Sequence, residues 1–253
     1  MTTGAPGARA ATSERAVRAR IVGRVIFIVL RVAVAIAIAA ATTTTYVVAA
    51  AEWDRAGYAD RATLITNFWS YFTILSNVSA VIVLLIGAWV LLRGGDDPGW
   101  FSVLRASVVT YMAVTGIVYN LLLRGIAVTG AGEGQAWTNE VMHVIGPLYL
   151  VLDWLFAPGR RAIDWRHVWT VLAFPILWVV YTLIRGPLVY DQVKVQWTWY
   201  PYPFLNPANS QTGYFSVAFY VVLIAAVFGL VAAGVIWVSR RWPDIRKGSP
   251  ATG

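Results

Sequence analysis

The sequence predicts an all-α integral membrane protein, a bundle of six transmembrane helices with both termini in the cytoplasm. Hydrophobic residues make up 58% of the 253 positions and the mean hydropathy is +0.64, whereas soluble domains are about 45–50% apolar. Runs of about 20 apolar residues recur, the length that crosses a hydrocarbon core of roughly 30 Å. The basic residues lie in short segments between these runs, a pattern that indicates membrane topology rather than a nucleic-acid partner.

The elements follow from these runs, taken in order. Residues 1–20 are expected to form a disordered basic tail and residues 241–253 a second basic tail, around a membrane domain at 21–240. The first apolar run is too long for a signal peptide and lacks a clean cleavage site. The six spans are expected at 22–50, 67–92, 101–123, 137–157, 166–185 and 213–239.

The distribution of Lys and Arg predicts which side of the membrane each segment occupies. With both termini and the loops at 93–105 and 158–166 assigned to the cytoplasm, that side holds 14 of the 20 basic residues. The opposite side holds 5, and Arg31 lies within the first span. Because basic residues favour cytoplasmic loops, we expect a multi-pass protein of the inner (plasma) membrane with both termini inside.

The last external loop, about 186–212, contains "VQWTWYPYPFLNP". Trp and Tyr prefer the membrane–water interface, and the prolines prevent a regular helix. The loop is therefore interpreted either as an interfacial aromatic belt or as a rigid cap over a site that opens to the outside.

Two charged residues fall inside expected spans near the cytoplasmic side. Ionisable groups in a span are costly and are expected to be paired. Arg31 and Asp153 lie at similar depth, so we expect an ion pair that compensates both burial costs. The alternative is that Arg31 extends to the cytoplasmic surface.

The segment "NFWSYFTILSN" is unusually polar for the start of a span. At 100° per residue Ser70, Thr73 and Asn77 fall within about 60° of one another and are expected to face the bundle. His143 and Thr73 each lie six residues in from the outer end of their span, a depth of roughly 9 Å. The sequence thus predicts a hydroxyl and an imidazole at the same level.

Further polar residues surround this pair. Glu140 lies one turn above His143 and is expected to orient its ring, while Asn120 and Arg124 lie at the outer end of the third span. A hydroxyl nucleophile needs a base, a group that holds the base and donors for the oxyanion. The residues equally permit a structural interpretation, in which the hydroxyls bond to helix carbonyls and His143 joins helices.

Two stretches, "SYFTILSN" at 70–77 and "NEVMHVIGPLYLVLDWL" at 139–155, resemble the androgen-induced family of membrane proteins and its bacterial relatives. The "YPYPFLNP" loop is a third distinctive segment. The eukaryotic members are membrane threonine hydrolases that cleave fatty acid esters of hydroxy fatty acids. The resemblance implies Thr73 as nucleophile and His143 as the second essential residue. Longer outer loops and the basic N-terminal tail depart from the eukaryotic pattern and leave the substrate open.

The leading hypothesis is therefore a lipid-ester hydrolase in which Thr73 attacks the carbonyl and His143 acts as base and then acid. Asn77 is expected to contact the oxyanion. The expected substrate-binding or orienting residues are Ser70, Glu140, Asn120 and Arg124, with Arg124 or Arg185 available for a substrate carboxylate. The expected partners are membrane lipids. The chain has no Cys and two His, so neither a metal nor another cofactor is expected.

Three other functions are compatible with the sequence. The first is a non-catalytic protein that binds a lipid or small molecule in the same pocket. A transporter is weakened by the lack of an inverted repeat or a helix broken at its middle. Haem-based electron transfer would need a second intramembrane histidine, and His167 lies at the cytoplasmic edge, far from His143.

Overall fold

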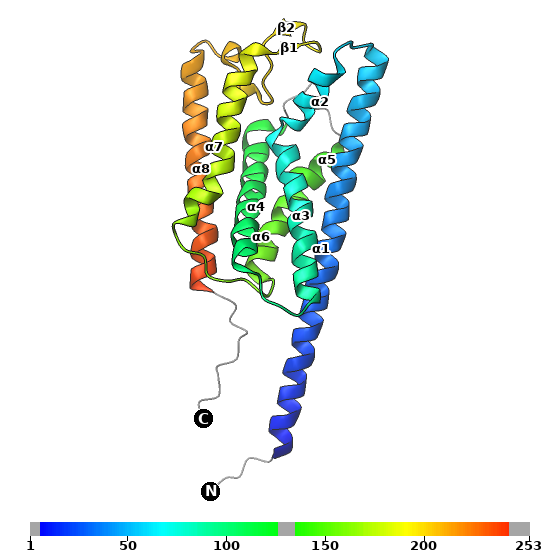
Figure 1. Cartoon of the computed structure of the whole chain (residues 1–253), viewed down its shortest axis with the longest axis vertical. Helices are drawn as coiled ribbons and strands as arrows, with labels where there is room; N and C mark the ends of the chain where they lie inside the picture. Colours follow the sequence, from blue (N-terminus) through cyan, green and yellow to red (C-terminus); the bar gives the residue numbers. More distant parts are fainter. Residues whose placement is uncertain (1–5, 126–134, 243–253) are drawn as a thin grey trace.

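The computed structural model describes residues 6–125 and 135–242, which form a helical bundle (Figure 1). Its helices confirm the predicted all-helical class, and five of them are long and apolar enough to cross a membrane. A two-stranded antiparallel hairpin, β1 (Tyr190–Asp191) and β2 (Gln196–Trp197), lies at one end, called here the hairpin end. The α-helices are α1 (Pro6–Ala56), α2 (Arg61–Trp69), α3 (Phe72–Leu92), α4 (Gly99–Val118), α5 (Ala136–Glu140), α6 (Gly146–Phe156), α7 (His167–Arg185) and α8 (Tyr214–Arg241).

Helix α4 forms the centre of the bundle and packs against α3, α6, α7 and α8, while α1 lies along α3 (Figure 1). The buried face of α4 is largely apolar and includes Phe101, Val109 and Met112. The start of α1 and the end of α8 lie at the same end of the molecule, opposite the hairpin end. This arrangement places the loop that joins α7 to α8 above the central helix.

The segment expected to be a disordered N-terminal tail is helical from Pro6 onwards, so that prediction is wrong for 6–20. The reason is local. The stretch is rich in Ala and Arg, which have high helix propensity, and it extends an existing helix, so no new nucleus is needed. The lower part of α1 projects beyond the other helices in Figure 1. Residues 1–5, and most of the predicted C-terminal tail at 243–253, lie outside the described residues.

The span predicted at 67–92 is broken at Ser70 and Tyr71 into α2 and α3. Tyr71 is extended, with φ −70° and ψ 126°. The backbone groups freed at the break find side-chain partners: Trp178 Nε1 donates to the Ser70 carbonyl at 3.0 Å, and the Thr73 N–H donates to Tyr202 Oη at 3.1 Å. Helix ends within a bundle are stable when such partners satisfy their backbone groups.

Two short π-helical segments interrupt the predicted third and fourth spans. Helix α4 continues into η1 (Tyr119–Leu123), and η2 (Val141–Ile145) joins α5 to α6. A π turn inserts an extra residue, which rotates the side chains beyond it, and such turns often occur at functional sites. Tyr119 and His143 lie in these two segments, so their directions do not follow from a uniform 100° helix.

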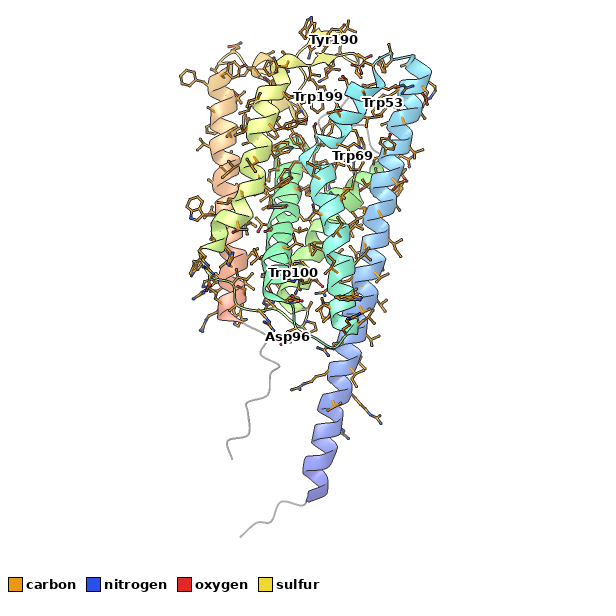
Figure 2. All side chains as sticks on the ribbon, viewed as in Figure 1. Trp53, Trp69, Asp96, Trp100, Tyr190 and Trp199 are labelled. Carbon is orange, nitrogen blue, oxygen red and sulfur yellow. The ribbon has the colours of Figure 1, made fainter. Side chains whose placement is uncertain are left out.

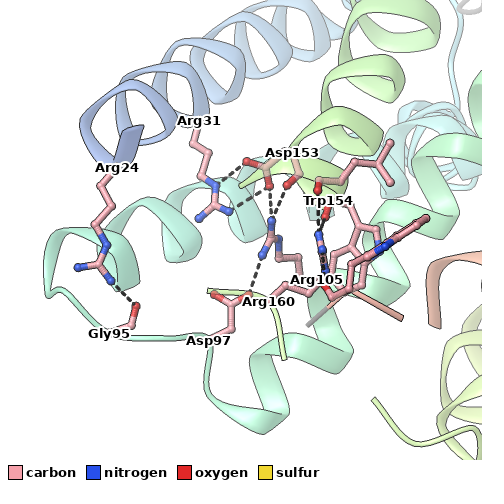
Figure 3. Close-up of polar contacts among 10 residues, drawn as sticks. Arg24, Arg31, Gly95, Asp97, Arg105, Asp153, Trp154 and Arg160 are labelled. Atoms are coloured by element: carbon pink, nitrogen blue, oxygen red, sulfur yellow. Dashed lines mark hydrogen bonds and ion pairs between the residues drawn. The ribbon is translucent and has the colours of Figure 1, made fainter. Parts of the chain in front are cut away.

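The predicted ion pair between Arg31 and Asp153 is confirmed, with Arg31 Nε donating to Asp153 Oδ1 at 2.8 Å and Nη2 to Oδ2 at 3.1 Å (Figure 3). Arg105, which the topology count assigned to a loop, is instead buried in α4 with 1% of its surface exposed. It donates to Asp153 Oδ2 at 2.8 Å and to Asp97 Oδ2 at 2.7 Å. Two arginines and two aspartates thus form a neutral arginine cluster, which compensates the burial of each charge.

Candidate functional site

A cavity of about 130 Å³ lies between α3, α4, α7 and α8 towards the hairpin end, and it is called here the helix cavity. Its wall is almost entirely apolar, with polar groups from Thr73, Thr115, Tyr119 and Tyr202. The volume exceeds by several-fold the 10–15 Å³ of comparable space that one water needs. Dry apolar cavities of this kind accept apolar ligands. The larger lining side chains are Phe72, Val118, Leu172, Trp178, Phe204, Ile224 and Phe228.

Thr73 lies in the first turn of α3, directly after the helix break, and it is buried in the cavity wall. Its hydroxyl and the Tyr202 hydroxyl are 3.1 Å apart, and its N–H also donates to Tyr202. Burial raises the pKa of Tyr202, so the phenol stays protonated and able to donate. The pair therefore places two hydroxyls at the edge of an otherwise apolar cavity.

His143 lies in η2, where its ring stacks on Tyr119 with centroids 3.9 Å apart. Its Nδ1 lies 3.0 Å from the Asn139 carbonyl oxygen. A carbonyl only accepts, so this contact places the proton of a neutral ring on Nδ1 and leaves the lone pair on Nε2. That tautomer is suited to a general base, and Tyr119 connects the ring to the cavity wall.

Thr73 and His143, however, are not hydrogen-bonded to each other in the structure. The Thr73 hydroxyl pairs with Tyr202, a residue on the loop after α7 that the sequence did not single out. The expectation that Glu140 orients His143 is also wrong, because Glu140 forms an ion pair with Arg124 at 2.9 Å and Asn139 holds the ring instead. Both charged residues are about half exposed, so this pair lies at the surface of the site.

Asn77 is buried but does not face the Thr73 hydroxyl. Its Nδ2 donates to the Thr73 carbonyl at 2.9 Å and to the Met142 carbonyl at 3.2 Å. Both amide protons are therefore used, which contradicts the predicted oxyanion role. Asn77 instead joins α3 to η2 and holds the backbone of the two candidate segments together.

Ser70 and Asn120 also have structural partners. Ser70 Oγ donates to the Thr66 carbonyl at 2.7 Å and lies 2.9 Å from the hydroxyl of Tyr181 in α7. The helix break turns Ser70 away from Thr73. The three residues predicted to share one face, Ser70, Thr73 and Asn77, are therefore buried but contact three different segments: α7, the loop after α7, and η2. Asn120 donates to the Gly116 carbonyl at 2.8 Å and more weakly to the His143 carbonyl at 3.3 Å, and it accepts from Arg124 at 2.8 Å.

The loop between α7 and α8 covers the hairpin end, where Tyr190 lies at the top and Trp199 lies deeper, level with Trp53 (Figure 2). Trp199, Tyr200 and Leu205 are buried within the protein, as expected for a rigid cap. Trp197 is 71% exposed, as an interfacial belt requires. Each interpretation thus fits a different part of the loop, and both stay predictions. The missed residue Tyr202 belongs to the buried part, and its only sequence signal was the distinctive "YPYPFLNP" stretch.

Among residues 6–125 and 135–242, no three His, Cys, Asp or Glu side chains are grouped as a metal site would require. No protein-family model, no curated protein and no solved structure matches this chain. The function is therefore argued from the geometry of the cavity.

Proposed function

We propose that this chain is a six-span protein of the plasma membrane with both termini in the cytoplasm. The sixth span is the continuous helical segment α5–η2–α6, from Ala136 to Phe156, in addition to the five long helices. The excess of basic residues, which is 13 against 5 once the buried Arg105 is left out of the 14, supports a cytoplasmic position for the end opposite the hairpin. The hairpin end then faces outward, and the helix cavity lies in the outer half of the membrane.

The function that the geometry supports best is the binding of a lipid, with its acyl chain in the helix cavity. The observation that carries this proposal is the position of the Thr73 and Tyr202 hydroxyls at the edge of an apolar cavity. An acyl chain buries apolar surface there, which is favourable by about 0.8 kcal/mol for each CH₂ group. The two hydroxyls supply polar contacts for an ester or another oxygen-bearing group where the chain ends.

This proposal is tested by filling the cavity. Ala225 and Ala226 of α8 are both exposed, but only Ala225 lines the cavity. Ala225→Phe is expected to abolish photocrosslinking of a diazirine fatty acid to the purified protein, while Ala226→Phe leaves it unchanged. Equal crosslinking of both variants would show that the acyl chain binds elsewhere.

A second candidate function is hydrolysis of a lipid ester, favoured by the presence of the Thr73 hydroxyl in the cavity wall. In this reaction Thr73 Oγ attacks the ester carbonyl carbon, its proton passes to His143 Nε2, and the alcohol leaves with that proton. Water then cleaves the acyl-threonine, and the acid is released. Tyr202 is a better placed oxyanion donor than Asn77, because its phenol already contacts Thr73.

Hydrolysis requires the imidazole to come within hydrogen-bonding distance of Thr73 Oγ1. Contacts between catalytic groups often form only when substrate is bound. Ligand entry can displace the Tyr202 hydroxyl from Thr73 and free the nucleophile. Lipid binding alone needs no such rearrangement, which is why it is the leading proposal.

A fluorophosphonate probe distinguishes the two candidates. A hydrolase is expected to be labelled at Thr73, with labelling lost in Thr73→Ala and retained in Thr73→Ser. Ser79→Ala is the matched control, because Ser79 lies on the same helix and its hydroxyl bonds to the Leu75 carbonyl. Absence of labelling in the wild type, together with bound lipid that stays intact, would leave binding as the function.

A further inference from the structure

A second cavity, called here the cap cavity, lies within the hairpin end. It measures about 90 Å³ and is bounded by the end of α1, by α2 and by the loop between α7 and α8. In contrast to the helix cavity, about half of its wall is polar. The polar lining side chains include Asn67, Asp191, Lys194 and Gln196, among the aromatic residues Trp53, Tyr71, Trp199, Tyr200 and Tyr202.

One buried donor in this wall has no acceptor. Trp53 Nε1 is buried and has no hydrogen-bond partner within the described part of the chain. Native proteins seldom leave such a group unpaired, so it requires an acceptor from outside the chain. Since the Trp53 side chain lines the cap cavity, the missing acceptor is expected to belong to the occupant of that cavity.

The carboxylate of Asp191, in contrast, is an acceptor in the cavity wall that can take a further donor. The carboxylate is buried, and Oδ1 accepts from the backbone N–H groups of Val193 and Lys194 at 3.0 and 3.2 Å. Across the described ranges no cation forms an ion pair with it. Its remaining acceptor capacity therefore calls for a donor in the cavity.

Tyr202 forms part of the wall of both cavities. The helix break runs alongside it: Tyr71 lines the cap cavity, whereas the next two residues, Phe72 and Thr73, line the helix cavity. The Thr73–Tyr202 pair thus lies at the junction between a polar compartment and an apolar one. This division matches a molecule with a polar head and a single apolar chain.

We propose that the two cavities form one bipartite site for an uncharged single-chain lipid whose head carries several hydroxyl groups, such as a monoacylglycerol. The head occupies the cap cavity, the chain occupies the helix cavity, and the linking ester lies at the junction beside Thr73. The inference rests on the proposed lipid binding and adds the chemical class of the ligand.

The groups of the cap cavity favour hydroxyls over charged heads. A hydroxyl can accept from Trp53 Nε1 and donate to Asp191, so a polyol satisfies both groups. A carboxylate head would meet the buried Asp191 carboxylate, which repels it, whereas the lysine of the wall, Lys194, is exposed to solvent and screened. An ammonium head offers no acceptor for Trp53 Nε1. The aromatic rings add apolar faces for the carbon atoms of the polyol.

The test uses the full-length protein in phosphatidylcholine nanodiscs and 1-O-oleylglycerol, an ether lipid that has no ester to cleave. Binding is expected to be at least tenfold tighter than that of oleate or oleylamine, measured by competition with the radiolabelled ether. Trp53→Phe and Asp191→Asn are each expected to weaken it at least tenfold. Asparagine keeps Oδ1 for the two backbone N–H groups, so the loop retains its turn.

Trp69→Phe, on the half-exposed face of α2, is the matched control and is expected to bind as the wild type does. Equal affinity for oleate or oleylamine, or wild-type binding by both Trp53→Phe and Asp191→Asn, would overturn the assignment of the head. Ala225→Phe distinguishes failure of the proposed head site in the cap cavity from failure of the proposed lipid binding in the helix cavity. If this variant loses all binding while the cap variants lose none, only the head site is wrong, whereas normal binding by Ala225→Phe overturns the lipid site itself.

Discussion

At the scale of single residues, the hydrogen-bond partner of the Thr73 hydroxyl is the hydroxyl of Tyr202. The helical pattern placed Thr73 on an inward face, which the structure confirms, since the residue is buried. Its partner comes from a loop about 130 positions later in the chain, and no local pattern can specify such a contact. The side chain that the sequence paired with it, His143, instead stacks on Tyr119.

Tyr202→Phe tests this contact. The substitution removes the phenol and leaves the Thr73 N–H and hydroxyl without their partner, so we expect a loss of about 1–3 kcal/mol in the free energy of unfolding. Thermal or denaturant unfolding in detergent measures it. Tyr220→Phe, which removes a hydroxyl from a partly buried ring nearby, is expected to change stability by less than about 0.5 kcal/mol.

A second residue-scale prediction concerns the arginine cluster. Asp153→Ala removes the carboxylate shared by Arg31 and Arg105, both almost fully buried. Leaving buried cations uncompensated is expected to cost about 3–5 kcal/mol. The comparison is Asp54→Ala, which breaks the exposed pair with Arg61 and is expected to cost about 0–1 kcal/mol. Equal losses of stability in the two variants would contradict the role of the cluster.

At the scale of elements, the predicted spans correspond to helical segments of the structure, five of which include a helix long and apolar enough to cross a membrane, but two kinds of interruption were not predicted. The apolar runs located these long helices because a helix that crosses lipid requires about 20 apolar residues. They did not reveal the break at Ser70 and Tyr71 or the π turns at Tyr119 and His143. The break depends on two distant residues, Trp178 of α7 and Tyr202 of the following loop, that satisfy the freed backbone groups.

The docking of the cap onto α7 gives an element-scale prediction. A Cβ at Gly186, directly after α7, would overlap the ring of Tyr200, so Gly186→Ala must displace the cap. We expect a loss of about 1–3 kcal/mol in unfolding free energy, as for other overpacked sites. The matched change is Gly229→Ala in α8, where no atom lies within 4 Å. It is expected to be neutral or to stabilise the helix by up to about 1 kcal/mol.

At the scale of the whole molecule, the start of α1 and the end of α8 lie at one end and the cap lies at the other (Figure 1). This arrangement agrees with an even number of membrane crossings. The orientation relative to the cell rests on the distribution of basic residues. It determines whether ligands reach the two cavities from the outer leaflet or the inner one.

The orientation can be measured directly, because the chain has no native cysteine. Gln211→Cys in the cap and Arg161→Cys in the loop after α6 are both at exposed positions. A membrane-impermeant maleimide is expected to label Gln211→Cys in intact cells, and Arg161→Cys only after the membrane is permeabilised. The reverse labelling pattern would invert the proposed topology.

The sequence by itself determined the class of the protein, the positions of its apolar segments and the pairing of Arg31 with Asp153. Each of these follows from the large free-energy cost of placing unpaired backbone groups or charges in an apolar medium, which is visible in the sequence of each segment. Only the tertiary structure decided that α2 and α3 are separate and that Thr73 faces Tyr202. It also showed that an apolar and a polar cavity meet at this pair. These features arise from contacts between distant segments, which form only when the loop after α7 folds back over the bundle.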